Sequence, residues 1–497
     1  MNKLSLLLLF TCSLKALTEG QLDTSFNPSG SIPGTQTVTD TSLGATTAAA
    51  LRAVTQSDGK IIQVGYTEVS GTKKISVARY TRDGILDTSF NASATVPGVV
   101  QTAIGSYSGL VQATGVALQS DGKVVVVGVA GNGLTTLNGI IVRYKTDGTL
   151  DTTFNASGSQ PGVVETSISG FDYASGLSGV VIQSNGRIVI CGGLWQDATY
   201  KIVVMRYTAA GVIDTTFGGG NGYIIKLESA WSAAIASSLR LQSDQKIVLS
   251  GYATIGGVKN FLVARFATNG DYDTTFNSVG YVTTDIGSGS DSVGTDLRIQ
   301  SDGKIVIGGY ATVSGTMQFA LARYTTVGAL DTGSFNASAG YITTNVTTSG
   351  SGSHTSKAWG VDLQADGKAV LGGYSTLSST NYFAVARYTT AGALDTTFND
   401  SGHQAGTNTV SLSSETGGDL SFGTVMQPDG RVILSGYIGS PVQGFGLARF
   451  IGLPVVVPAV QETDANSKVS LIGLGTGSVT KAKAFYALLR EKYYDWV

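Results

Sequence analysis

Short apolar runs, each bounded by polar or Gly-containing turns, follow one another along most of the chain. Within residues 293–345 the runs are "VGTDLRIQ", "IVIGGYA", "QFALARYT" and "GYITTNV". Alternation of apolar and polar positions over runs this short predicts β-strands. The first two runs are separated by "SDGK", and an Asp-Gly pair between apolar runs predicts a tight hairpin turn. This stretch therefore predicts four strands.

The four-strand unit recurs seven times, with a period of 58 to 64 residues. Three markers recur in fixed order: a sequence like "LQSDGK", one like "ARY" and one like "LDTTF". Repeats of this length, filled with short strands and Gly turns, are typical of β-propeller blades. The sequence predicts an all-β fold, a seven-bladed β-propeller of four-stranded blades over residues 17–453.

The order of the markers predicts how the ring closes. An "LDTSF" stands at residues 22–26 with no "ARY" before it, and the last "ARF", at 448–450, has no "LDTTF" after it. In the six complete units the Arg precedes the Asp by eight residues. We therefore expect Asp23 to pair with Arg449, and the strand around residues 35–40 to complete the last blade. Closing the ring with both chain ends would remove exposed sheet edges.

The repeated Arg and Asp residues are interpreted as structural pairs. A guanidinium and a carboxylate that face each other across a short turn suit a paired ion bond, and a group repeated in every blade usually holds the blade together. A set of anion-binding arginines is the alternative interpretation. The expected pairs are Arg79–Asp87, Arg143–Asp151, Arg206–Asp214, Arg265–Asp273, Arg323–Asp331, Arg387–Asp395 and Arg449–Asp23.

The repeat "QSDGKIVIGGY…FALARY…LDTTF" resembles that of the delta-60 repeat propellers, over about residues 20–452. The resemblance implies a seven-bladed propeller, usually on exported bacterial proteins, and implies no settled activity. Two units depart from the repeat: "SDQK" at 243–246 lacks the turn Gly, and "SNGR" at 184–187 replaces Asp and Lys. We expect the fold to tolerate both changes, because Asn-Gly also forms tight turns.

The N-terminus "MNKLSLLLLFTCSLKA" has an early Lys, a short apolar run and small residues that end near Ala16. This pattern predicts a secretory signal peptide at residues 1–16, and its apolar run is too short to span a bilayer. Lipid attachment at Cys12 is the alternative. We expect a secreted or cell-surface protein in which Cys191 is a buried small hydrophobe.

The C-terminal segment, residues 454–497, differs in character from the repeats. A polar linker leads to "TKAKAFYALLREKYYDWV", in which apolar residues keep helical spacing. This pattern predicts one amphipathic helix. We expect the helix to bind a partner or to self-associate, and it is too short and charged to span a membrane.

Composition narrows the range of functions. Charged residues make up 13 % of the chain and the net charge is −2, so no basic field exists to hold nucleic acid. With two His residues in the sequence, a catalytic triad or a zinc site has little support. The sequence predicts no metal and no cofactor, with calcium in the channel as an alternative role for aspartates there.

The candidate binding face is the one opposite the constant segments. In a four-stranded blade "SDGK" and "LDTTF" lie in connections that emerge on the same face. We expect the other two connections, on the opposite face, to vary freely in length and content. Aromatic side chains next to acidic ones suit sugars and polar surfaces, although they can also fill gaps between blades. The candidate ligand-binding residues are Tyr107, Phe171, Asp172, Tyr173, Trp195, Asp197, Trp231 and Trp359.

From these features we predict a non-catalytic exported binding platform for a glycan or a surface protein, acting through the variable face. The alternative is a secreted carbohydrate-active hydrolase or lyase that uses carboxylates in the propeller channel. Asp296, Asp362 and Asp419 begin predicted innermost strands, from which their carboxylates could face that channel. Such an enzyme needs two carboxylates at a set separation.

Overall fold

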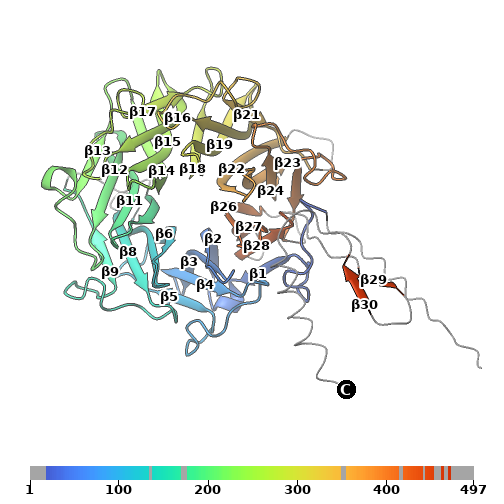
Figure 1. The fold of residues 1–497 in the computed structure, drawn as a ribbon. Helices are drawn as coiled ribbons and strands as arrows, with labels where there is room; N and C mark the ends of the chain where they lie inside the picture. Colours follow the sequence, from blue (N-terminus) through green and yellow to red (C-terminus); the bar gives the residue numbers. More distant parts are fainter. Residues whose placement is uncertain are drawn as a thin grey trace, which may run out of the picture. The chain divides into compact units, whose positions relative to one another are not determined.

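Seven four-stranded antiparallel blades surround a central axis, as the sequence predicts (Figure 1). The structure is a computed structural model that describes residues 18–133, 137–169, 176–348, 354–413, 418–439, 443–452, 460–463 and 468–471. The chain divides into two units, Thr18–Leu453 and the pair of segments Met1–Leu17 and Pro454–Val497. The predicted signal peptide and C-terminal helix both lie outside the described residues.

Each blade runs in sequence order from its innermost to its outermost strand. Blade 1 comprises β2 (Thr47–Thr55), β3 (Ile61–Val69), β4 (Thr72–Tyr80) and β5 (Val99–Thr102). Blade 2 comprises β6 (Leu110–Leu118), β7 (Val124–Gly131), β8 (Asn138–Tyr144) and β9 (Val163–Thr166). Blade 3 comprises β10 (Leu177–Ile182), β11 (Ile188–Gln196), β12 (Thr199–Tyr207) and β13 (Tyr223–Lys226). Blade 4 comprises β14 (Ala233–Leu241), β15 (Ile247–Ile255), β16 (Val258–Phe266) and β17 (Tyr281–Thr284).

The remaining blades follow the same order until the ring closes. Blade 5 comprises β18 (Ser292–Ile299), β19 (Ile305–Val313), β20 (Thr316–Tyr324) and β21 (Tyr341–Thr344). Blade 6 comprises β22 (His354–Leu363), β23 (Ala369–Leu377), β24 (Thr380–Tyr388) and β25 (Thr407–Val410). Blade 7 comprises β26 (Leu420–Met426), β27 (Val432–Ile438), β28 (Gly444–Phe450) and β1 (Thr35–Thr39). Two 3-10 turns are η1 (Thr41–Leu43) and η2 (Gly218–Gly220).

Outside the propeller, β29 (Val460–Thr463) pairs antiparallel with β30 (Lys468–Leu471). Both strands fall in the segment that the sequence pattern predicts to be a linker.

The Arg–Asp pairs lie on the face that carries the constant connections, and each one joins its blade to the next. The Arg Nε lies 2.7 to 2.9 Å from its Asp in all seven blades. Nη1 of the same Arg donates to a carbonyl of the following blade at 2.5 to 2.8 Å. The Phe of "LDTTF" lies under the guanidinium, with the Arg Cζ 4.5 to 4.8 Å from the ring centroid. These contacts explain why the three residue types recur together.

The basic residue of the "SDGK" turn also binds the Asp of each Arg–Asp pair. Its side chain lies 2.7 to 3.4 Å from the same Asp Oδ2 in every blade. In "SNGR" Arg187 makes this contact, which explains why the substitution is tolerated. In "SDQK" Gln245 takes the place of the turn Gly with φ +66°. Non-Gly residues adopt this region less readily than Gly, so we expect this turn to be less stable than the other six, which keep the Gly.

Both chain ends build blade 7. β1 pairs with β28, and Asp23 Oδ2 lies 2.8 Å from Arg449 Nε and 2.7 Å from Arg431 Nε. Gly20 N donates a hydrogen bond to Ile451 O at 2.7 Å. The equivalent hydrogen bond in blade 1 runs from Gly84 N to Thr81 O, within one continuous turn. The predicted ring closure is therefore observed. Blades 7 and 1 are also joined by one parallel residue pair, Ala49 with Gly444.

One expectation about the variable face is wrong. The connections between second and third strands do not vary freely, because five of them are two-residue turns with positive φ at both positions. This is the type I′ geometry that matches the twist of a hairpin. The turns are Ser70–Gly71, Asp197–Ala198, Gly256–Gly257, Ser314–Gly315 and Ser378–Ser379. Variation is left to the two longer connections, between Gly131 and Asn138 and between Ile438 and Gly444, and to the connections between blades.

Candidate binding site at the mouth of the central channel

Every innermost strand contains a β-bulge at the same position, and the bulged residue lines the channel. Opposite the bulge the second strand carries a Gly, because no side chain would fit there. A Cβ at Gly65, for example, would lie 1.9 Å from the carbonyl oxygen of Ala49. A bulge re-aims the side chain of its extra residue. The bulged residues are Leu51, Thr114, Ser178, Ser237, Thr295, Trp359 and Phe422.

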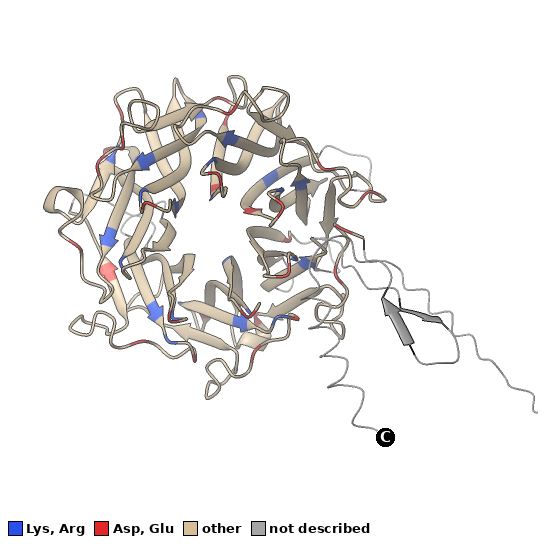
Figure 2. Ribbon diagram, viewed as in Figure 1, with Lys and Arg blue, Asp and Glu red and all other residues tan. Residues whose placement is uncertain are grey.

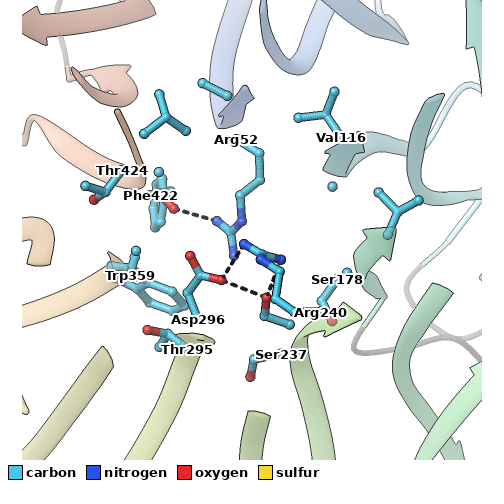
Figure 3. A pocket seen from close by; sticks show the side chains of 18 of the residues that line it. Arg52, Val116, Ser178, Ser237, Arg240, Thr295, Asp296, Trp359, Phe422 and Thr424 are labelled. Carbon is cyan, nitrogen blue, oxygen red and sulfur yellow. Dashed lines mark hydrogen bonds and ion pairs between the residues drawn. The ribbon is translucent and has the colours of Figure 1, made fainter. Parts of the chain in front are cut away.

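Two cavities that share lining residues lie along the channel at these bulges, and Figure 3 shows the narrower one. A constriction of about 70 Å³ is lined by Arg52, Arg240, Asp296 and Arg298 among others. A wider cavity of about 360 Å³ is lined by all seven bulged residues together with Tyr252 and Tyr310, and we call it the vestibule. Its volume falls within the range of ligand pockets.

The vestibule lies toward the variable face. Tyr252 pairs with Ile235 near the start of β14, and Tyr310 pairs with Val293 near the start of β18. Innermost strands start at the variable face, because their other ends run into the "SDGK" turns. The vestibule is thus the channel mouth on the face that the sequence marked as the candidate binding face.

Five tyrosines occupy equivalent positions on the second strands and form an arc, and two of them, Tyr252 and Tyr310, line the vestibule. Each follows the Gly that faces a bulge, in blades 4, 5, 6, 7 and 1, and each is half-buried. Burial is the main cause of their raised pKa values, which reach about 12 for Tyr252 and for Tyr310, and neighbouring phenols add to the shift. The phenols therefore stay protonated at neutral pH and can donate hydrogen bonds. The members of the tyrosine arc are Tyr66, Tyr252, Tyr310, Tyr374 and Tyr437.

Two bulged aromatic residues connect members of the arc. The ring centroids of Trp359 lie 6.1 Å from Tyr310 and 5.4 Å from Phe422, and Phe422 lies 6.0 Å from Tyr437. Lysines lie over the rings of three arc members. Lys259 Nζ is 5.1 Å from the ring centroid of Tyr252, Lys357 Nζ is 5.0 Å from that of Tyr310, and Lys73 Nζ is 5.0 Å from that of Tyr66. The mouth therefore offers aromatic faces, phenol donors and cations together.

Deeper in the channel, charged side chains form a chain across blades 4, 5 and 6. Arg240 Nη2 lies 3.0 Å from Asp296 Oδ1, and Arg298 Nη1 lies 2.9 Å from Asp296 Oδ2. Arg298 Nε lies 2.9 Å from Asp362 Oδ1, and the other oxygen of Asp362 accepts a hydrogen bond from Met426 N in blade 7. Both channel carboxylates are thus engaged by Arg298.

These ion pairs bear on the enzymatic alternative. Burial by itself would raise the pKa of Asp296, but Arg298, Arg240 and the Ser238 hydroxyl lower it below the usual value. A general acid in glycoside cleavage needs a raised carboxyl pKa, so Asp296 is poorly suited to that role. Asp419 was expected at the channel, but its carboxylate is buried beside β26 and accepts hydrogen bonds from Leu412 N and Gly439 N.

Arg52 enters the constriction from blade 1 (Figure 3). Its Nη1 donates to Leu51 O at 2.9 Å and to Phe422 O at 2.7 Å. Burial lowers the pKa of this guanidinium, and Asp296 opposes the shift. Among the described residues Arg52 forms no ion pair.

The three Trp residues predicted from sequence to bind a ligand lie in the channel, in the core and at the surface. Trp359 is not in a loop but at the bulge of β22, where it lines the vestibule. Trp231 is 5 % exposed and packs edge-on against Tyr281, with centroids 4.8 Å apart, so it fills the core of blade 4. Trp195 is 37 % exposed at the variable end of β11 and packs edge-on against Tyr200.

The other candidates lie away from the vestibule or outside the described residues. Asp197 is exposed in the turn after β11. The Tyr107 hydroxyl donates to Glu165 Oε2 at 3.0 Å and accepts from Asn138 at 2.8 Å, so it is already engaged. Phe171, Asp172 and Tyr173 lie outside the described residues.

The tyrosine arc and Phe422 were missed from sequence. The available signal was the dipeptide Gly-Tyr, which ends the apolar run of the second strand in five blades. The dipeptide recurs with the repeat, and a feature repeated from blade to blade indicates blade packing more readily than ligand binding. The bulge that opens the mouth cannot be recognised from one strand alone.

Among the described residues, neither charge nor clustered metal ligands indicate a second candidate site. Lys and Arg are spread around the whole ring and interspersed with Asp and Glu (Figure 2). In the part of the chain that the structure describes, no group of three or more His, Cys, Asp or Glu could hold a metal ion. No helix among those residues is long and apolar enough to cross a bilayer.

Among solved structures, the likenesses are weak. Drosophila Plexin A in complex with Semaphorin 1b is 9 % identical, with 88 % of each chain covered and a TM-score of 0.42. A family PL25 ulvan lyase bound to -[GlcA(1-4)Rha3S]- is 8 % identical, with 84 % of this chain and 96 % of that chain covered and a TM-score of 0.41. Sqt1 from Chaetomium thermophilum is 8 % identical, with coverage of 82 % and 96 % and a TM-score of 0.40. Likenesses at this level carry no argument about activity.

No curated protein sequence matches the chain. Six segments match the family described as "Domain of unknown function (DUF5122) beta-propeller", at residues 56–90, 119–154, 183–217, 242–276, 300–333 and 364–398. Each segment runs from the "SDGK" turn of a blade into its "LDTTF". The corresponding parts of blade 7 lie at the two ends of the propeller sequence. Over these six segments the chain is similar to DUF5122 β-propeller repeats.

Proposed function

We propose that this propeller is a non-catalytic binding protein whose ligand is a glycan, held in the vestibule by the tyrosine arc, Trp359 and Phe422. The observation that carries the proposal is the set of aromatic residues around a cavity of about 360 Å³. Sugar rings pack their C–H faces on aromatic rings, while their hydroxyls bond to phenols and lysines. A concave site of this size suits one or two sugar residues better than a flat protein surface.

The protein is proposed to act at the cell surface or outside the cell. The N-terminal pattern at residues 1–16 and the resemblance to delta-60 repeat proteins support export. In all seven blades an ion-paired Arg also donates a hydrogen bond to the next blade, and such contacts suit a rigid platform. The enzymatic alternative has less support, because Arg298 engages both channel carboxylates.

The proposal is tested by a glycan array probed with the full chain and with a Tyr252→Leu, Tyr310→Leu double variant. The matched control is Tyr341→Leu, because Tyr341 lies on the outermost strand of blade 5. We expect the double variant to lose at least tenfold in affinity for the glycans that the parent chain binds, and the control to keep it. Equal binding by all three proteins would place recognition elsewhere.

A further inference from the structure

The channel carries more positive than negative charge. Across the seven innermost strands, β2, β6, β10, β14, β18, β22 and β26, there are four cations and two anions, a difference of +2. The whole chain has a net charge of −2, so the strands that surround the channel have the opposite sign. A narrow low-dielectric opening of one sign concentrates counter-ions. The cations are Arg52, Arg240, Arg298 and Lys357, and the anions are Asp296 and Asp362.

Arg52 is the channel guanidinium with free capacity. Arg240 and Arg298 are held by Asp296 and Asp362, whereas Arg52 uses Nη1 alone for hydrogen bonds to described residues. A guanidinium has five N–H donors and pairs best with a planar carboxylate. Its side chain points into the constriction (Figure 3). Burial of a guanidinium without a paired anion is unfavourable, and the lowered pKa of Arg52 has burial as its main cause.

Ser237 supplies a second donor to the same space. It is the bulged residue of β14 and lines both the constriction and the vestibule. Three other bulged hydroxyls, those of Thr114, Ser178 and Thr295, donate to carbonyls of the next blade. The Ser237 hydroxyl has no hydrogen-bond partner among the described residues. It therefore remains available at the junction of the two cavities.

We propose that the constriction binds a carboxylate through Arg52 and Ser237, and that the ligand is therefore an acidic glycan that contains a uronic acid. This inference rests on the proposed function, because the vestibule would hold the sugar ring while its acid enters the constriction. A single negative charge matches the one guanidinium without a carboxylate partner. Asp296 and Asp362 would repel a dianionic phosphate more strongly than a singly charged carboxylate. The constriction of about 70 Å³ also favours a small planar group.

The test compares the full chain on uronic-acid oligosaccharides, on the same oligosaccharides with each carboxyl reduced to the alcohol, and on sulfated neutral counterparts. We expect binding to the acidic form to be at least tenfold tighter than to the reduced form. Arg52→Gln should remove that preference while binding to the reduced form stays the same. Arg52→Lys should keep part of it. Arg82→Gln is the matched control, because Arg82 is half-exposed and pairs with Asp429.

Each other outcome has a distinct meaning. Equal binding of acidic and reduced glycans would overturn this inference and leave the proposed function intact. A preference for sulfated over carboxylated glycans would overturn the assignment of a carboxylate. An acid preference that survives both Arg52→Gln and Ser237→Ala would overturn the placement in the constriction. Failure to bind any glycan would overturn the proposed function as well. Comparison of acidic with reduced glycans needs no variant, so it remains decisive if Arg52→Gln does not fold.

Discussion

Arg449, in the last strand of the propeller, forms a buried ion pair with Asp23 near the start of the chain, with Nε and Oδ2 2.8 Å apart. The same contact joins residues eight positions apart in the six other blades. In blade 7 it links the two ends of the propeller instead. The pair therefore fastens the ring while it performs the same structural role as its six counterparts.

Removal of Asp23 should open this closure. Asp23→Ala leaves the buried Arg449 and its neighbour Arg431 without their carboxylate, and an uncompensated buried charge costs about 3–5 kcal/mol. We expect a clear fall in the urea midpoint of unfolding. Asp83→Ala is the control, since Asp83 is exposed and lies 3.7 Å from Arg449, and it should change stability by less than about 1 kcal/mol. Equal effects of both variants would contradict a closing role for Asp23.

The closure also predicts a circular permutant. Ile451 N donates to Gln21 O at 2.9 Å, as Thr81 N donates to Ile85 O at 2.7 Å in the unbroken turn of blade 1. By this correspondence Gly452 and Glu19 occupy adjacent positions of one turn.

A chain in which Gly452 is joined directly to Glu19, with new ends between Ser288 and Gly289, should therefore fold into the same ring. Far-ultraviolet circular dichroism and thermal unfolding would measure the outcome. A permutant that stays unfolded would show that the two ends do not form a turn of native length.

The stability of the propeller against unfolding should fall only below about pH 4. Burial alone would raise the pKa of Asp87, Asp214 and Asp273, but hydroxyl, Lys and Arg hydrogen bonds and charges bring it to about 2. A depressed carboxyl pKa contributes stability above the unfolded value of about 3.9, and that stability is lost as pH falls toward the folded value. We expect the urea midpoint to hold from pH 7 to about 4 and to drop between about 4 and 2. A midpoint that declines mainly above pH 5 would contradict this assignment.

The bulge that opens the channel mouth depends on a Gly in each second strand. Gly65→Ala would place a Cβ 1.9 Å from Ala49 O, so either the bulge or the blade must shift. We expect a loss of at least about 2 kcal/mol in the free energy of unfolding. Gly133→Ala is the control, because no atom lies within 4 Å of the added Cβ there, and it should have an effect of about 0.5 kcal/mol or less. Equal stabilities of the two variants would contradict the requirement for Gly65.

The architecture could be predicted from the sequence because the residues that make one contact recur in all seven repeats. The eight-residue spacing of Arg79 and Asp87 identified the pair, and its interruption at both ends identified the closure. The repeat could not show that Arg79 also donates to Thr146 O in the next blade, since that contact depends on how neighbouring blades pack.

The candidate site was harder to predict, because side-chain direction at a bulge depends on the partner strand. Trp359 has no sequence feature that distinguishes a channel residue from a loop residue, yet its bulge turns it into the vestibule. Trp231, which the loop composition had marked for binding, lies in the core beside Tyr281. The variable face was a useful expectation, whereas most of the residues chosen on it were not those that border the mouth.

The most direct test of a glycan site at the channel mouth is a crystal structure of the full chain with a glycan that it binds on the array. The account predicts density for a sugar ring in the vestibule, against Trp359 and Tyr310, with its carboxylate toward Arg52. Density only on the face that carries the "SDGK" turns, or only around Trp195, would contradict it.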